Sequence, residues 1–298
     1  MPRRGRHKPM TDQADLVRCL TAPNPSPLTG TGTNTYLVGS GDIAVIDPGP
    51  DLDHHLEAIL ANLRPKERIG QIIVTHAHRD HSALAARLAA QTGASVLAFG
   101  DAFAGRSPGM AVRAARLGPA GEGLDLDFQP DQRLFDKDRI AGPDWELVVH
   151  HTPGHLGGHL CLALGQTLFS GDHVMGWSTS VVAPPDGDMG DYMGSLHRLA
   201  QGEWRRCLPG HGPAVEDPLA RIDWLIRHRQ SREAAILKEL SQGPSTIPVL
   251  AQRLYLGIAP SLLGAAELNI LAHLIDLLDR NLVSAQPWPD LTAIYARL

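Results

Sequence analysis

Residues 72–81 read Ile72-Ile73-Val74-Thr75-His76-Ala77-His78-Arg79-Asp80-His81. An apolar, β-branched run, typical of a buried strand, leads directly into three imidazoles and one carboxylate. Neutral imidazole nitrogens and carboxylate oxygens are ligands that suit zinc and related divalent metals. Taken alone, the stretch is compatible with a site for one metal, a site for two metals, or no metal site.

Three later fragments share one form: a short apolar run, a turn that contains glycine, and then a histidine or aspartate. They are Thr152-Pro153-Gly154-His155, Ser170-Gly171-Asp172-His173 and Pro209-Gly210-His211-Gly212. Glycine lets the backbone turn sharply and approach a ligand closely. Because each fragment follows a strand-like run, the pattern indicates that one edge of a folded sheet gathers these side chains.

Together, these fragments resemble the ligand set of the metallo-β-lactamase superfamily: His76-x-His78-x-Asp80-His81, then His155, Asp172 and His211. Residues 34–38 and 44–50 also resemble that family's first hairpin and the loop that follows it. Past residue 217 the chain is most similar to the β-lactamase-like protein 2 branch, which carries a C-terminal winged-helix-type module. Asp191-Tyr192-Met193-x-Ser195-Leu196 and His228-Arg229-x-x-Arg232 resemble local patterns of that branch.

The resemblance implies an α/β fold, a metallo-β-lactamase αβ/βα sandwich followed by a small, mainly helical winged-helix-like domain. We expect an N-terminal tail and edge segment over residues 1–30, a catalytic domain over 31–217 and the winged-helix-like domain over 218–298. Apolar residues at helical spacing predict three helices in the last segment, before a β-prone piece at 282–285. Residues 100–130, rich in glycine, alanine and proline, are either an insertion over the site or a surface excursion.

The resemblance also implies how the ligands divide. His76, His78 and His155 are expected to hold one metal, and Asp80, His81 and His211 a second, with Asp172 bridging the two. Zinc is the default expectation for both metals, and iron and manganese are the alternatives. Two metals about 3.5–4 Å apart can share a water and lower its pKa to near 7. We therefore expect a metal-bridging hydroxide as nucleophile, with Asp80 and Asp172 as the catalytic carboxylates.

Other polar residues are weaker candidates with two interpretations each. His159 either orients a ligand or is an ordinary strand residue bonded to backbone. Ser178 and Thr179, on the loop after Asp172, are candidates for substrate contact. His228, Arg229 and Arg232 either bind a phosphate or carboxylate of the substrate or form ion pairs within the protein.

Five further histidine and aspartate residues have expectations of their own. Asp47 and His151 are expected to contact the metal ligands from outside. His54, His55 and His197 are expected on the exposed faces of helices.

The expected activity is hydrolysis of an ester, a thioester or a similar acyl bond in a small molecule. Endoribonuclease-type cleavage of single-stranded RNA is the alternative, because paired metals suit phosphoryl displacement and the branch that the chain resembles includes nucleases. A catalytically inactive binding protein is disfavoured, since no ligand is missing. A winged-helix regulator of duplex DNA is disfavoured as well, because residues 218–298 hold eight Lys or Arg against seven Asp or Glu.

Composition sets the remaining expectations. The net charge of −5 indicates no general attraction to nucleic acid or to an anionic membrane. The three cysteines form no C-x-x-C pair, which suits a reducing compartment. The sequence has no run of 18 apolar residues that would predict a transmembrane helix, and no apolar segment follows the basic residues Arg3 to Lys8. We therefore expect a cytoplasmic protein; the sequence indicates no oligomeric state, and a dimer is compatible with it.

Overall fold

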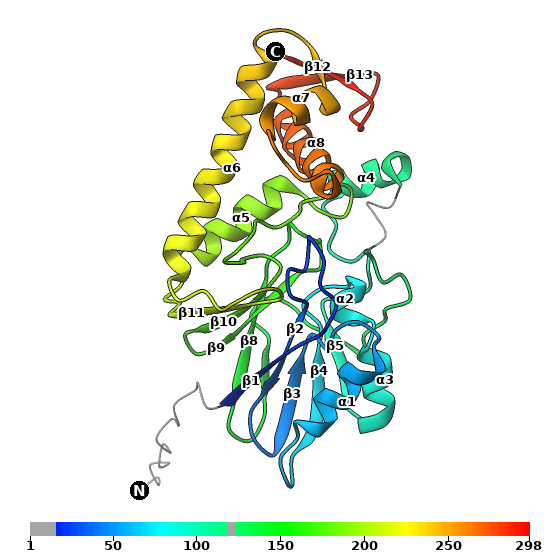
Figure 1. Cartoon of the computed structure of the whole chain (residues 1–298), viewed down its shortest axis with the longest axis vertical. Helices are drawn as coiled ribbons and strands as arrows, with labels where there is room; N and C mark the ends of the chain where they lie inside the picture. Colours follow the sequence, from blue (N-terminus) through cyan, green and yellow to red (C-terminus); the bar gives the residue numbers. More distant parts are fainter. Residues whose placement is uncertain (1–15, 119–122) are drawn as a thin grey trace, which may run out of the picture.

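Two β-sheets pack face to face, with helices on their outer faces and a small helical domain at one end (Figure 1). The computed structural model describes residues 16–118 and 123–298, so residues 1–15 of the predicted N-terminal tail and edge segment (residues 1–30) lie outside it. The first sheet has the order β1-β2-β3-β4-β5-β6, with strands Val17–Thr21, Asn34–Val38, Asp42–Ile46, Arg68–Ile73, Ser95–Ala98 and Gln132–Arg133. The second has the order β11-β10-β9-β8-β7, with strands, from β7 to β11, Arg139–Ala141, Glu146–His151, Leu160–Leu164, Thr167–Gly171 and Arg206–Pro209.

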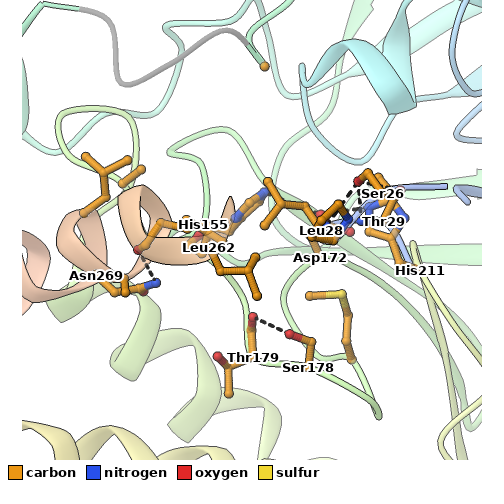
Figure 2. A pocket seen from close by; sticks show the side chains of 18 of the residues that line it. Ser26, Leu28, Thr29, His155, Asp172, Ser178, Thr179, His211, Leu262 and Asn269 are labelled. Atoms are coloured by element: carbon orange, nitrogen blue, oxygen red, sulfur yellow. Dashed lines mark hydrogen bonds and ion pairs between the residues drawn. The ribbon is translucent and has the colours of Figure 1, made fainter. Parts of the chain in front are cut away.

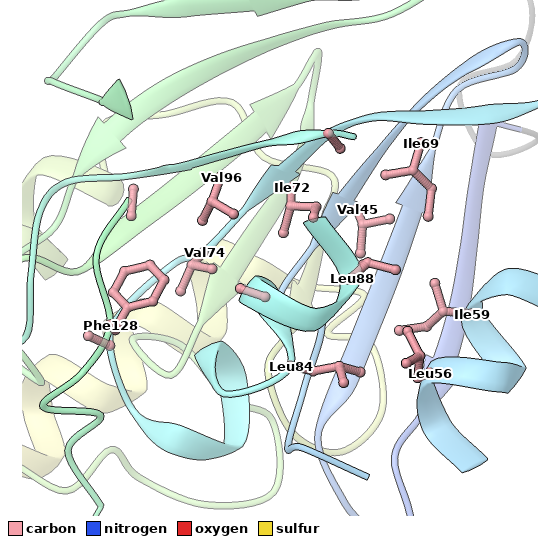
Figure 3. Close-up of a cluster of buried hydrophobic side chains, with 14 of the residues drawn as sticks. Val45, Leu56, Ile59, Ile69, Ile72, Val74, Leu84, Leu88, Val96 and Phe128 are labelled. Atoms are coloured by element: carbon pink, nitrogen blue, oxygen red, sulfur yellow. The ribbon is translucent and has the colours of Figure 1, made fainter. Parts of the chain in front are cut away.

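Successive side chains of a strand pack into two different cores, one between the sheets and one under the outer helices. In β4, Ile72 packs against the outer helices whereas Ile73 packs between the two sheets, because successive side chains of a strand point to opposite faces. The outer helices of the first sheet are α1 (Asp53–Ala61) and α3 (Ala85–Thr92). Figure 3 shows this outer core, in which Leu56, Ile59 and Leu88 from the helices meet Val45 and Ile72 from the sheet. This arrangement confirms the expected αβ/βα sandwich.

The second sheet is covered by α5 (Met189–Leu199) and by the first half of α6 (Pro218–Leu240). Tyr192 of α5 is fully buried there, and Leu225 of α6 packs in the same cluster. The long α6 then continues past the sandwich and reaches the C-terminal domain (Figure 1). One helix therefore belongs to both cores.

The C-terminal domain consists of β12 (Ser245–Thr246), α7 (Ile247–Leu254), a 3₁₀ turn η2 (Pro260–Leu262), α8 (Leu263–Asp279), β13 (Val283–Gln286) and β14 (Ile294–Arg297). Residues 260–279 form a helix that is, by length and composition alone, long and apolar enough to cross a membrane. Half of that window is buried inside the protein, where Ile270, Leu274 and Ile275 pack in the domain core. Burial in a core therefore accounts for its apolar character.

The described residues of the 100–130 segment, 100–118 and 123–130, contact both domains. Their helix α4 (Pro108–Leu117) buries Met110 in the core of the C-terminal domain, and Arg113 pairs with Asp279 of α8. Further along, Leu124 forms a backbone bridge with His78 in the predicted ligand stretch. The segment is therefore part of the surroundings of the site.

Candidate metal centre

The seven predicted ligands come together at one end of the sandwich. β4 ends at Ile73 and leads to His76 and His78, and the short helix α2 (Arg79–Ser82) carries Asp80 and His81. The other three follow separate strands of the second sheet: His155 after β8, Asp172 after β10 and His211 after β11. Their donor atoms form three overlapping groups, each within 4.8 Å: His76, His78 and His155; His76, His81 and Asp172; Asp80, His81 and His211.

The first group consists of three imidazoles whose nitrogens converge. His78 Nδ1 lies 2.9 Å from His76 Nε2 and 3.0 Å from His155 Nε2. Such mutual proximity of nitrogen lone pairs, with His76 and His155 buried and His78 partly buried, is the arrangement expected where a cation is bound.

Asp80, His81 and His211, called the second group from here on, place their donor atoms at the corners of a nearly equilateral triangle. His81 Nε2 lies 3.3 Å from His211 Nε2 and 3.4 Å from Asp80 Oδ2, and His211 Nε2 lies 3.3 Å from the same Asp80 oxygen. Tetrahedral ligands at about 2.0–2.1 Å from a zinc-sized ion would be separated by about 3.3 Å. The spacing of the three donors therefore fits one divalent metal.

Asp172 lies between the two groups. Its Oδ1 is 3.5 Å from His81 Nε2, and its Oδ2 is 3.3 Å from His211 Nε2 and 3.7 Å from His155 Nε2. The Oδ1 atom is buried and has no hydrogen-bond partner among the described residues. A buried carboxylate oxygen without a donor is costly, and a cation on each side would compensate it.

Acceptors outside the centre fix the tautomers of three histidines. His155 Nδ1 lies 2.6 Å from Val181 O, His211 Nδ1 lies 3.2 Å from Gly32 O, and His81 Nδ1 lies 2.9 Å from Asp47 Oδ2. Carbonyl and carboxylate oxygens only accept, so each Nδ1 carries the proton and donates it. The Nε2 atoms that face the centre are therefore unprotonated in the neutral rings and available to a metal.

Asp47 acts on both groups. Besides His81, it accepts hydrogen bonds from Thr75 N at 2.7 Å and from Thr75 Oγ1 at 2.8 Å. Because the Thr75 hydroxyl hydrogen is used there, His76 Nδ1, 3.0 Å away, must donate to Thr75 Oγ1. One carboxylate thus orients His81 directly and His76 through Thr75, the outside role expected for Asp47.

The histidine pKa values are shifted in opposite directions in the three-histidine group and in the second group. Burial, and then the neighbouring imidazoles, lower the pKa values of His76 and His78, the latter to about 3. Burial also opposes the charge on His81 and His211, but the carboxylates around them dominate: the pKa of His81 is raised and that of His211 reaches about 9. The three-histidine group is therefore neutral at pH 7, and the second group takes up protons when no metal balances its carboxylates.

Comparison with known proteins agrees with this geometry. A model of the metallo-β-lactamase superfamily matches residues 28–211, more than half of the chain. The chain belongs to the metallo-β-lactamase superfamily. A model of the β-lactamase-associated winged helix domain matches residues 246–287. Superfamily members are generally hydrolytic metalloenzymes that typically bind two metal ions, so the chain is a metallohydrolase of this superfamily.

Individual relatives cover most of the chain. The β-lactamase-like protein 2 homolog of Drosophila melanogaster is 33% identical over 242 residues, 78% of this chain and 76% of the relative. A metallo-β-lactamase family protein from Thermus thermophilus superposes with a TM-score of 0.77 at 25% identity, over 95% of this chain and 99% of that one. The protein TTHA1623, solved in a di-iron-bound form, has a TM-score of 0.52 at 29% identity, over 69% of this chain and 98% of that one.

In this metallo-β-lactamase fold, His159 contacts the bridging position. Its Nε2 accepts a hydrogen bond from the backbone N–H of Asp172 at 3.2 Å, and its Nδ1 donates to Thr152 Oγ1 at 2.9 Å. The bond from Asp172 is a backbone bond at a predicted ligand, so these contacts fit both interpretations of His159.

Residues 180–182 connect the centre to α6 and α8. Ser180 Oγ donates to the carbonyl oxygen of Asp172, and Val181 O accepts from His155. On the other side, Arg229 donates to Ser180 O, and Val182 N donates to Asn269 Oδ1 at 3.1 Å. The sequence did not indicate a role for Asn269, because it is a polar residue in a largely apolar helix with no motif around it.

His228, Arg229 and Arg232, the three candidates on α6 for substrate contact, have different surroundings. Arg229 is only 2% exposed, and its terminal nitrogens bind Ser180 O and Asn269. Arg232 binds the carbonyl oxygen of Leu254 at 2.7 Å and stacks on Tyr255. His228 stacks on Trp224 and lines the cavity over the centre. Both guanidinium groups are therefore used in packing the C-terminal domain against α6.

Two further histidine expectations need correction. His55 is buried on α1, not exposed, and its Nε2 lies 2.8 Å from Thr35 Oγ1. The ring of His151 stacks on Phe99, and its Nε2 lies 2.9 Å from Gly157 O. These contacts do not involve a predicted ligand. His54 and His197 are exposed as expected.

A cavity of about 590 Å³ opens over the centre. Ser178 and Thr179 line it, as do His78, Asp80, His155, Asp172 and His211. Figure 2 shows that η2 and α8 contribute Leu262 and Asn269, whereas the loop after β1 contributes Ser26, Leu28 and Thr29. Its volume is that of a typical pocket for a small molecule.

Proposed function

We propose that the protein is a dinuclear metallohydrolase that cleaves an ester, thioester or similar acyl bond of a small molecule. His76, His78 and His155 would hold one metal, Asp80, His81 and His211 the other, and Asp172 would bridge them. When bound, the two ions would lower the pKa of a shared water and polarise the acyl carbonyl. The water oxygen forms the new bond to the acyl carbon, the bond to the leaving oxygen or sulfur breaks, and the leaving group takes the proton.

The chain's own residues contribute charge and position. Asp80 and Asp172 offset part of the positive charge of two divalent ions, and the fixed tautomers of His81, His155 and His211 keep their Nε2 atoms aimed inward. The surrounding cavity holds the substrate next to these groups, so binding converts the reaction into an effectively intramolecular one.

The observation that carries the proposal is the charge of the cavity. Among the described residues that line it, apart from the predicted ligands, only His228 and Arg229 are cationic types. Burial and then the nearby arginines lower the pKa of His228, and the Arg229 guanidinium is committed to Ser180 and Asn269. A single-stranded nucleic acid needs a positively charged groove along its backbone, which favours a neutral acyl substrate.

Zinc is our proposal for the metal, because histidine-rich donors at tetrahedral spacing suit it. Iron and manganese are the other candidates, since imidazole and carboxylate ligands also bind these metals, and TTHA1623 carries two irons. Metal analysis of protein expressed in metal-supplemented medium distinguishes them.

Turnover on a matched panel tests the proposal. The panel contains an acyl-glutathione thioester, a lactone, an aryl ester, a bis-aryl phosphodiester, a β-lactam and single-stranded RNA, each with metal-loaded and chelator-treated protein. We expect hydrolysis of the thioester, lactone or aryl ester that is lost on chelation and restored by metal. Cleavage of RNA without turnover of any acyl substrate would establish the nuclease instead.

A further inference from the structure

The C-terminal domain forms one wall of the cavity, although it supplies none of the predicted ligands. We use the name C-terminal wall for the side chains of this domain that line the cavity and are apolar or aromatic: Tyr255, Ile258, Leu262, Ala265, Ala266 and Leu268. They come from the connection between α7 and α8 and from the start of α8. A domain without ligands therefore borders the place where substrate must lie.

The wall carries no charge. Its two polar neighbours in the cavity lining are Ser261 and Asn269. The amide oxygen of Asn269 accepts from Arg229 and Val182, and one of its N–H groups donates to Ala265 O at 2.9 Å. A polar substrate group placed against the aliphatic side chains of the wall would lose water without gaining a partner, whereas an apolar group would be stabilised by the area removed from water.

Apolar side chains also approach from the catalytic domain. Leu28, Met175 and Trp177 line the same cavity, and Leu28 and Trp177 are 52% and 41% exposed. In Figure 2, Leu262 lies on the α8 side of His155, and Leu28 lies on the side of Asp172 and His211. The predicted ligands are thus bordered by apolar surface from both domains.

We propose that the substrate carries an apolar group larger than acetyl, an alkyl or aryl chain, which packs against the C-terminal wall while the scissile bond lies at His155 and Asp172. This inference rests on the acyl hydrolase proposed above and assigns a specificity role to the winged-helix domain. The chain can be on the acyl side or on the leaving-group side of the bond, and the experiment separates the two.

Two homologous series test the inference with metal-loaded protein. One contains N-acetylcysteamine thioesters from acetyl to decanoyl, and the other contains acetate esters from methyl to decyl. We expect kcat/KM to rise by roughly fourfold per methylene in one series until the cavity is filled, the gain expected for burying a methylene. The series that rises identifies the side of the bond that carries the chain.

Matched variants locate the effect. Leu262→Ala and Ile258→Ala should each lower, by about tenfold, the ratio of kcat/KM for the octanoyl compound to that for the acetyl compound, or for the octyl to the methyl compound. Leu263→Ala is the control, since Leu263 is the next residue, is 37% exposed and does not line the cavity. Metal content and the thermal midpoint of each variant show whether it is folded.

Binding gives a readout that does not depend on turnover. Calorimetry with decanoate and acetate should show tighter binding of decanoate, with a negative heat-capacity change, weakened in Leu262→Ala. Equal kcat/KM across both series, with acyl turnover present, would overturn the apolar-group inference alone. Absence of turnover for every ester and thioester would overturn the proposed function itself.

Discussion

Asn269 on α8 accepts a hydrogen bond from Arg229 on α6, with 3.0 Å between Oδ1 and Nη1. The same oxygen accepts from Val182 N, and the neighbouring Val181 O holds the Nδ1 proton of His155. The C-terminal domain therefore helps to position a predicted metal ligand in the catalytic domain.

Replacing this amide should affect metal binding. Asn269→Ala leaves the buried Arg229 Nη1 and Val182 N–H without an acceptor, which should lower the free energy of unfolding by about 1–3 kcal/mol. Because Val181 would lose a constraint, metal affinity at the three-histidine group should fall, by up to about tenfold, measured by competition with a chromophoric chelator. Asn269→Asp keeps the acceptor and should retain the affinity; an unchanged affinity in Asn269→Ala would contradict the relay.

Asp47→Asn should weaken both metal groups. Asp47 has φ +51°, a conformation that asparagine tolerates, so the backbone should be retained. The variant loses the carboxylate that accepts from His81 Nδ1 and Thr75 Oγ1. We expect an affinity loss of roughly 10–100-fold at both groups. A loss confined to the group that contains His81 would show that Thr75 does not transmit the effect to His76.

Gly210→Ala should disturb the centre without removing a ligand. A Cβ atom at this position would lie 2.5 Å from Asp172 Oδ1 and 2.6 Å from His81 Cε1, so both side chains would have to move. We expect weaker binding of at least one metal, seen in the stoichiometry after dialysis. Gly264→Ala, where a Cβ would meet nothing within 4 Å, is the control and should bind both metals.

Metal binding should release protons unequally. The pKa of His211 is about 9 and that of His81 is raised, so both rings are protonated at about pH 7.5 in metal-free protein, whereas His78, with a pKa of about 3, is neutral. A metal at the second group must displace those protons, so its affinity should fall as pH decreases. Calorimetry in buffers of different ionisation enthalpy should detect about one to two protons at this group and about none at the other. His211→Ala should release about one proton fewer; equal release at both groups would contradict the assignment.

The sequence could predict which side chains come together at the candidate centre because its motifs are local. His76, His78, Asp80 and His81 lie within one short stretch, and His155, Asp172 and His211 each follow a strand and a glycine turn, so strand ends bring them together. The layered sandwich, in contrast, was predicted from the resemblance to the metallo-β-lactamase superfamily.

What the sequence could not predict depends on partners far away in the chain. His55 looked exposed because its partner Thr35 lies 20 residues earlier, and Arg229 looked available because its partners Ser180 and Asn269 lie 49 and 40 residues away. The role of residues 100–130 was open for the same reason, since Met110 is buried in the core of the C-terminal domain, more than 100 residues further along the chain.

The most direct test of the central claim is a titration of chelator-treated protein with zinc, in which acyl thioester hydrolysis and bound metal are followed in one sample. The account predicts that activity rises until two metal ions are bound per chain. It also predicts that Asp172→Ala fails to bind the full two and loses at least about a hundredfold in turnover. Full turnover by metal-free protein, or by Asp172→Ala with two metals bound, would contradict the account.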